Sequence, residues 1–158
     1  MIKYFFNVPT RRYMIKTIYV AIVLLVSVSA FAGVGFQLEH PRHPSGQKDH
    51  YIIKCEKLCS LEIQTPESIK GEAPAGILEE KVRELMKLHK NGLFPKDLPS
   101  SQNKVLYRIK LDDGVTQFES TLGYPESYQA QEFTKFSKII SVVEEIKRLM
   151  KLELLRKK

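Results

Sequence analysis

The chain contains only two cysteines, Cys55 and Cys59, and three of its four histidines stand shortly before them. These histidines are His40, His43 and His50. Imidazole nitrogens and thiolates are ligands that zinc and copper prefer, so one hypothesis is a metal site built from these five side chains. The spacings H-x2-H and C-x3-C match no strong zinc pattern, however. The metal site is therefore kept as the alternative hypothesis.

The same two cysteines can instead form a disulfide. On one straight strand they would lie about 13 Å apart, whereas the Cα atoms of a disulfide lie within about 7 Å of each other. If the three intervening residues form a turn, Cys55 and Cys59 face each other across a hairpin at a Cα distance of about 4.5–5.5 Å. A thioredoxin-type redox pair would need C-x2-C at the start of a helix. The spacing therefore favours a structural disulfide in an oxidising compartment.

Familiar catalytic motifs are missing from the sequence, which has no G-x-S-x-G, no H-E-x-x-H and no glycine-rich phosphate loop. His89, close to the end of a predicted helix, is interpreted as a surface or capping residue. The neighbouring carboxylates Glu144-Glu145 and Asp112-Asp113 are interpreted as solvated charge. The sequence therefore predicts no catalytic residue and no cofactor, and we expect a protein that is not an enzyme.

Residues 1–32 are interpreted as a signal peptide. Basic residues are followed by an apolar stretch over 17–28 and by the A-x-A motif Ala30-Phe31-Ala32, after which we expect cleavage. Arg11-Arg12 also fits a twin-arginine signal, and Met14 could itself begin an ordinary one; without a cofactor motif we favour the ordinary route. The apolar stretch is shorter than the roughly 20 residues of a membrane span. We therefore expect a periplasmic or secreted protein that leaves the membrane after cleavage.

The net charge argues against nucleic-acid binding. The chain has 25 Lys and Arg against 18 Asp and Glu, a formal charge of +7. The predicted signal peptide holds four of the basic residues and none of the acidic ones, which leaves 21 against 18, a net charge of +3. An excess this small gives little attraction to a polyanion.

Periodicity predicts one α+β domain over residues 50–158. Residues 51–54, 61–65 and 68–70 have the pattern of short strands. Two amphipathic segments, 77–90 and 131–155, predict helices with one apolar face each. Residues 33–49 combine prolines, a glycine and polar side chains without an apolar period, which predicts an extended polar arm before the domain.

A hairpin is predicted between the two helices. Residues 105–111 alternate between an apolar and a more polar face, which is the period of a half-buried strand. Asp113-Gly114 is a preferred two-residue turn, and closing the hairpin there pairs Ile109 with Phe118. The predicted order is two or three strands, helix, hairpin, helix. We expect an antiparallel sheet of four to five strands with both helices on one face.

Residues 51–150 resemble two groups of small exported bacterial domains. The C-x3-C spacing of Cys55 and Cys59 is similar to that of an uncharacterised family with a C-x-G-x-C-P motif before its first helix. Residues 84–94, ELMKLHKNGLF, and the hairpin after them look similar to the emfourin-like inhibitors of thermolysin-type metalloproteases. The resemblance supports this fold more than any activity. The missing catalytic residues, together with extended strand edges that a partner could augment, favour an exported, non-enzymatic module that binds a protein partner, with a protease as one candidate. The alternative is a periplasmic metal-binding protein that uses the histidine arm and the cysteine pair.

Overall fold

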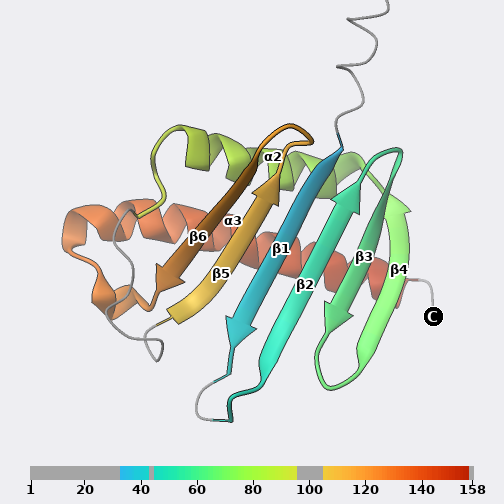
Figure 1. Ribbon diagram of the computed structural model, residues 1–158, viewed down its shortest axis with the longest axis horizontal. Helices are drawn as coiled ribbons and strands as arrows, with labels where there is room; N and C mark the ends of the chain where they lie inside the picture. The colour runs from blue at the N-terminus through green and yellow to red at the C-terminus, as the bar shows by residue number, and fades with distance from the viewer. Residues whose placement is uncertain (1–32, 43–44, 96–104, 157–158) are drawn as a thin grey trace, which may run out of the picture. The chain divides into compact units, whose positions relative to one another are not determined.

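In the part of the chain that the structure describes, six antiparallel strands and two long helices make up the fold (Figure 1). The computed structural model describes residues 33–42, 45–95 and 105–156. The strands are β1 (Val34–Pro41), β2 (Lys48–Cys55), β3 (Leu58–Gln64), β4 (Ser68–Pro74), β5 (Val105–Asp112) and β6 (Gln117–Gly123). They form one sheet in the order β4-β3-β2-β1-β5-β6, in which every neighbouring pair is antiparallel.

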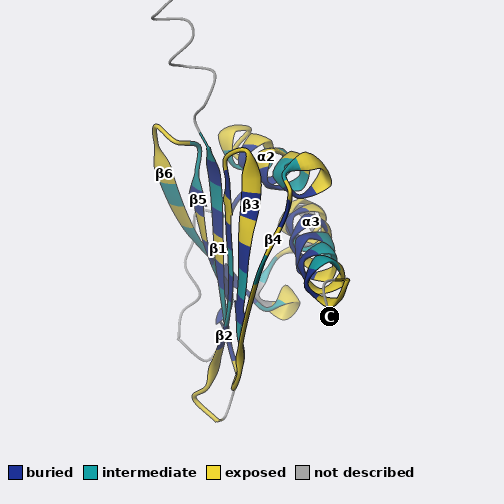
Figure 2. Ribbon diagram, turned by 90° about the vertical axis from the view of Figure 1, so that its right-hand side faces the viewer, coloured by how far each residue is buried: buried dark blue, intermediate teal, exposed yellow. Residues whose placement is uncertain are grey.

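The helices α2 (Gly76–Lys90) and α3 (Ala130–Leu155) lie on one side of the sheet (Figure 2). A short 3-10 turn, η3 (Pro125–Ser127), precedes α3. The helix α2 ends at a glycine in the left-handed region, Gly92 with φ 68°, a conformation that costs glycine nothing. The α+β class is therefore confirmed, and both helices occur where the apolar periodicity predicts them.

The core lies between the sheet and the two helices. Side chains alternate along each strand, so one face of every strand packs against the helices and the other faces away. Fully buried residues come from both layers: Phe36, Leu38, Ile53, Leu61, Val82, Leu85, Ile109, Leu122, Ile139, Val143, Ile146 and Met150. Four of the five strand pairings join consecutive strands, and only the pairing of β1 with β5 joins distant parts of the chain. This one pairing unites the two halves of the sheet, so the core depends on the assembled sheet.

The predicted polar arm is wrong, because most of it belongs to the sheet. The strand β1 lies between β2 and β5, where it pairs with β2 along its whole length. Val34, Phe36 and Leu38 are at most 2% exposed and alternate with Gly35 and Gln37 on the other face. This two-residue apolar period is short, and the histidines and prolines after it favour an irregular segment, so the sequence pattern does not indicate a strand here. The strand β1 therefore belongs to the domain, and the described sheet has six strands where four to five are predicted.

The predicted hairpin between β5 and β6 exists, but its register is wrong by two residues. Leu111 pairs with Phe118, and a four-residue turn replaces the predicted two-residue one. The carboxylate of Asp113 accepts hydrogen bonds from the backbone N–H groups of Val115 (3.2 Å) and Thr116 (2.8 Å). This side-chain capping stabilises the longer turn. A shift of two residues leaves every side chain on its predicted face, because the period of a strand is two.

The predicted signal peptide, residues 1–32, lies outside the described residues and stays a prediction. Within the described ranges, no helix combines the length and apolar character that crossing a membrane requires.

Candidate functional site

Cys55 and Cys59 face each other at the end of the β2–β3 hairpin, as the spacing predicts. They are directly opposite in the register, their Cα atoms are 3.9 Å apart, and a disulfide joins them. The turn between them is closed by a hydrogen bond from the N–H of Glu56 to the carbonyl oxygen of Leu58 (3.0 Å). Both cysteines are buried, at 2% and 0% exposure. Their position in the core indicates a structural bond, not a thiol pair accessible to substrates.

Replacing both cysteines by alanine is expected to lower the free energy of unfolding by about 2 kcal/mol, the loop-closure contribution of so short a loop. Urea unfolding of the oxidised protein and the C55A/C59A variant measures the difference. The wild-type protein unfolded with reductant present is the matched control and should lose a similar amount. Two alkylatable thiols in protein purified without reductant would contradict the disulfide.

The candidate metal ligands are not brought together where the structure describes them. His40 lies on the helix-facing side of β1, where its ring meets that of Tyr107 at a centroid distance of 4.9 Å. His50 pairs with Glu39 on the opposite face of the sheet. Both cysteines are used in the disulfide. His43 lies outside the described residues, and among those described no three His, Cys, Asp or Glu side chains could hold a metal ion.

His89 is not the surface or capping residue that the sequence suggests. Its ring lies between Phe94 (5.3 Å between centroids) and Phe118 (4.4 Å). Its Nδ1 atom is buried without a hydrogen-bond partner. Burial lowers the pKa of His89, and the positive charge of Lys90 lowers it further. A neutral imidazole packed between aromatic rings joins the end of α2 to β6, so His89 is a packing residue.

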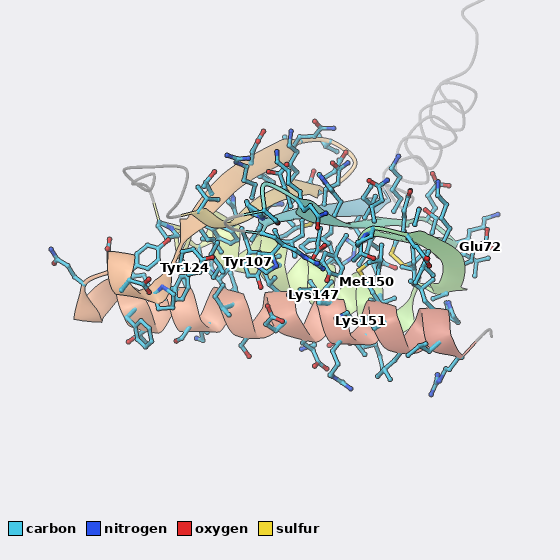
Figure 3. All side chains as sticks on the ribbon, turned by 90° about the horizontal axis from the view of Figure 1, so that it is seen from below. Glu72, Tyr107, Tyr124, Lys147, Met150 and Lys151 are labelled. Atoms are coloured by element: carbon cyan, nitrogen blue, oxygen red, sulfur yellow. A yellow bond between two sulfur atoms is a disulfide. The ribbon has the colours of Figure 1, made fainter. Side chains whose placement is uncertain are left out.

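A buried polar cluster lies between the sheet and α3, and the sequence interpretation overlooks it. Figure 3 shows Tyr107 of β5 and Lys147 of α3 in the layer between helix and sheet. Lys147 is 9% exposed, and its Nζ donates hydrogen bonds to the Tyr107 hydroxyl (3.0 Å) and to Oε1 of Glu144 (2.9 Å). The Tyr107 hydroxyl in turn donates to the same carboxylate oxygen of Glu144. The ammonium group also lies over the rings of Tyr51 (5.5 Å) and Tyr107 (5.1 Å).

Burial and neighbouring charges favour a neutral Tyr107 and an ionised Glu144 in this cluster. Burial raises the pKa of Tyr107, and the nearby Glu144 carboxylate raises it further. Burial also acts to raise the pKa of Glu144, but the hydrogen bonds from Tyr107 and Lys147 outweigh it, so the pKa lies below its ordinary value. The pKa of His40 is lowered by burial and then by the charge of Lys147. A neutral phenol that donates to an ionised carboxylate is a poor base and a poor nucleophile. We interpret the cluster as a structural network.

Sequence periodicity contains a signal for this cluster. Lys147 falls on the apolar stripe of α3, directly after Ile146 and four residues after Val143. Tyr107 falls on the apolar phase of β5, with Ile109 two residues later. A lysine on the apolar face of a helix and a tyrosine on the buried face of a strand both need polar partners in the core. Their positions therefore indicate that Lys147 and Tyr107 are partners of each other.

The two pairs of neighbouring carboxylates do not act as pairs. Glu144 is half exposed, and its carboxylate also accepts hydrogen bonds from Tyr107 and Lys147, whereas Glu145 forms an ion pair with Arg148 (2.7 Å). Asp113 caps the β5–β6 turn and pairs with Lys90 (2.9 Å), while Asp112 accepts a hydrogen bond from the backbone N–H of Gly114 (2.8 Å). Hydrogen bonds from the Thr116 backbone, then from Lys90, hold the pKa of Asp113 well below its usual range.

The face of the sheet that points away from the helices is polar, and most of its charges neutralise one another. Its ion pairs are Glu39 with Lys48 and with Arg108, Glu62 with Lys70, and Lys110 with Glu119. Lys54, by contrast, makes no ion pair with any described residue. A face with interspersed charges of both signs does not suit a polyanion, which needs a positive patch.

A shallow trough of about 420 Å³ crosses this open face where β1 begins. Its floor includes Gly33 and Gly35, so backbone lies where side chains would otherwise project. A Cβ atom at Gly35 would lie 3.1 Å from Cβ of Asp112, closer than ordinary packing allows. Lys54 lines one side of the trough, and Lys110 and Asp112 line the other. The trough therefore combines glycines that have no room for a side chain with charges of both signs around them.

Comparison of the chain with models of known protein families finds no match, and a search of curated proteins finds none either.

Proposed function

We propose that this chain is an exported, non-enzymatic module that binds a protein partner in the trough of the open sheet face. The observation that supports it best is the trough itself, which is lined by Gly33 and Gly35 and by charged side chains of both signs. By contrast, the polar groups of the buried cluster satisfy one another and leave no reactive group for a substrate. A binding surface is the simpler use of this arrangement.

A peptide segment suits the trough better than other ligands. Lys54 and Lys110 can donate to carboxylates and carbonyl oxygens, and Asp112 can accept from amides or a basic side chain. The low net charge of the face gives no advantage to nucleic acid or to an anionic membrane. A partner loop that projects into the trough would find hydrogen-bonding groups of both kinds.

A thermolysin-type metalloprotease is the first partner to test. The resemblance of residues 84–94 to emfourin-like inhibitors supports this choice, as does the predicted export into the compartment where such proteases act. A disulfide-bonded domain is compatible with that location.

Thermolysin activity on a peptide substrate is expected to fall as the purified mature protein is added. Lys54→Glu should weaken inhibition about tenfold, because the trough loses its unpaired cation and gains a repulsive charge. Lys135→Glu, an exposed change of the same kind on α3, should leave inhibition unchanged and is the matched control. Circular dichroism verifies that both variants fold. Full thermolysin activity in excess protein would refute the protease partner, and equal inhibition by both variants would refute the trough.

A further inference from the structure

The sheet has two edge strands, β4 and β6, and only β4 carries features that block pairing with another strand. Lys70 and Pro74 lie within β4, and both residue types protect natural sheet edges. The helix α3 also contacts this strand, since a Cβ atom at Gly71 would lie 2.6 Å from a methyl group of Leu154. The edge at β4 is therefore protected.

The strand β6 has neither lysine nor proline in its sequence QFESTLG. Its last residue shows which backbone groups point outward, because the N–H of Gly123 donates to the Tyr128 hydroxyl (2.7 Å) instead of to β5. Hydrogen-bonding direction alternates along a strand, so the N–H and C=O groups of Gln117, Glu119 and Thr121 also point away from β5. No described strand pairs with them. This edge can accept another strand.

We propose that a second copy of this chain occupies that edge, with the two β6 strands antiparallel about a two-fold axis at Ser120. The sequence around Ser120 is complementary to itself in this register. Phe118 of one copy lies opposite Leu122 of the other on the helix-facing side, so apolar meets apolar. Glu119 lies opposite Thr121, which keeps the two glutamates apart. The outward groups of Glu119 and Thr121 then exchange backbone hydrogen bonds, and the joined sheets form one sheet of twelve strands.

Exposed apolar residues at both ends of β6 support this arrangement. Val115, in the turn before β6, is 85% exposed. Phe133, near the start of α3, is 46% exposed, and its ring contacts Phe136, which contacts Tyr128 at the end of β6. In Figure 1 the start of α3 lies close to the end of β6. An antiparallel two-fold places the start of one β6 beside the end of the other. It therefore brings Val115 of each copy toward Phe133, Phe136 and Tyr128 of the other copy.

Charge changes at Thr121 test the proposal, because this residue faces Arg108 within one chain but Glu119 of the other copy in the dimer. A charge that suits one neighbour is repelled by the other. Thr121 pairs with Arg108 within one chain, so Thr121→Glu should not harm the fold. In the dimer it would place glutamate opposite Glu119 twice, and the dimer dissociation constant should rise about tenfold. Thr121→Lys should lower that constant, because each lysine faces Glu119 of the second copy. Sedimentation velocity of the mature protein from micromolar to millimolar concentration measures both. The control is Ser68→Glu, on the β4 edge, which should leave the dimer dissociation constant unchanged.

A cysteine at Ser120 tests the register. It would face its own copy across the axis as a non-hydrogen-bonded pair, whose Cα atoms lie about 4.5 Å apart, within the range of a disulfide. Mild oxidation should therefore give a covalent dimer of Ser120→Cys. Gln117→Cys would lie opposite Gly123 of the second copy and should stay monomeric on a denaturing gel. A protein that is monomeric at millimolar concentration, a dimer unaffected by Thr121→Glu, or preferential crosslinking through position 117 would each overturn the proposal.

Discussion

Replacing Phe36 by alanine is expected to lower the free energy of unfolding by about 3–5 kcal/mol. Phe36 is 0% exposed on β1, where it pairs with Ile53 of β2 and Leu111 of β5. Its ring lies in the core beneath the two helices, so truncation removes buried apolar area and leaves a cavity. Urea unfolding monitored by circular dichroism measures the change as a lower midpoint at an unchanged slope.

Gln37→Ala is the matched control for Phe36→Ala, because its side chain is exposed on the other face of the same strand. It should change the free energy of unfolding by no more than about 0.5 kcal/mol. The difference in stability between the two variants distinguishes a central strand from a loose N-terminal arm. In such an arm neither Phe36 nor Gln37 would contribute to the free energy of unfolding. Equal stability of the two variants would show that β1 does not belong to the core.

Glu144→Ala is expected to lower the free energy of unfolding by about 2–3 kcal/mol, because it leaves the ammonium of Lys147 buried with a single acceptor. That acceptor is the Tyr107 hydroxyl, which itself loses the carboxylate to which it donates. Although the carboxylate of Glu144 is itself half exposed, the group left without its counter-charge is buried. Urea unfolding at neutral pH measures the loss.

Lys147→Met should cost less than Glu144→Ala, about 1 kcal/mol, because it removes the buried charge together with its need for a partner. A methionine can also fill the space between the rings of Tyr51 and Tyr107. The neighbouring change Glu145→Ala breaks an exposed ion pair with Arg148 and should have no measurable effect. If the lysine variant were the less stable of the two, the cluster would contribute through the ammonium group itself and not through satisfaction of a buried charge.

Features that depend on neighbours along the chain can be predicted from the sequence. Both helices follow from their apolar stripes. The disulfide follows from the spacing of Cys55 and Cys59, since three intervening residues can turn and place the two opposite each other. In each case the physical cause is local: helix period, turn geometry or the short reach of a loop.

Features that depend on residues far apart in the chain are visible only in the folded structure. The position of β1 at the centre of the sheet is stabilised by pairing with β5, about seventy residues away. The short apolar period of Val34, Phe36 and Leu38 does not by itself specify these partners. The register of β6 depends on how the Asp113 carboxylate caps its turn. Glu144 differs from Glu145 because α3 places its carboxylate beside Tyr107 and Lys147, whereas Glu145 pairs with Arg148. Neighbours in space assign different roles to identical side chains, and these neighbours meet only once the sheet and helices have packed together.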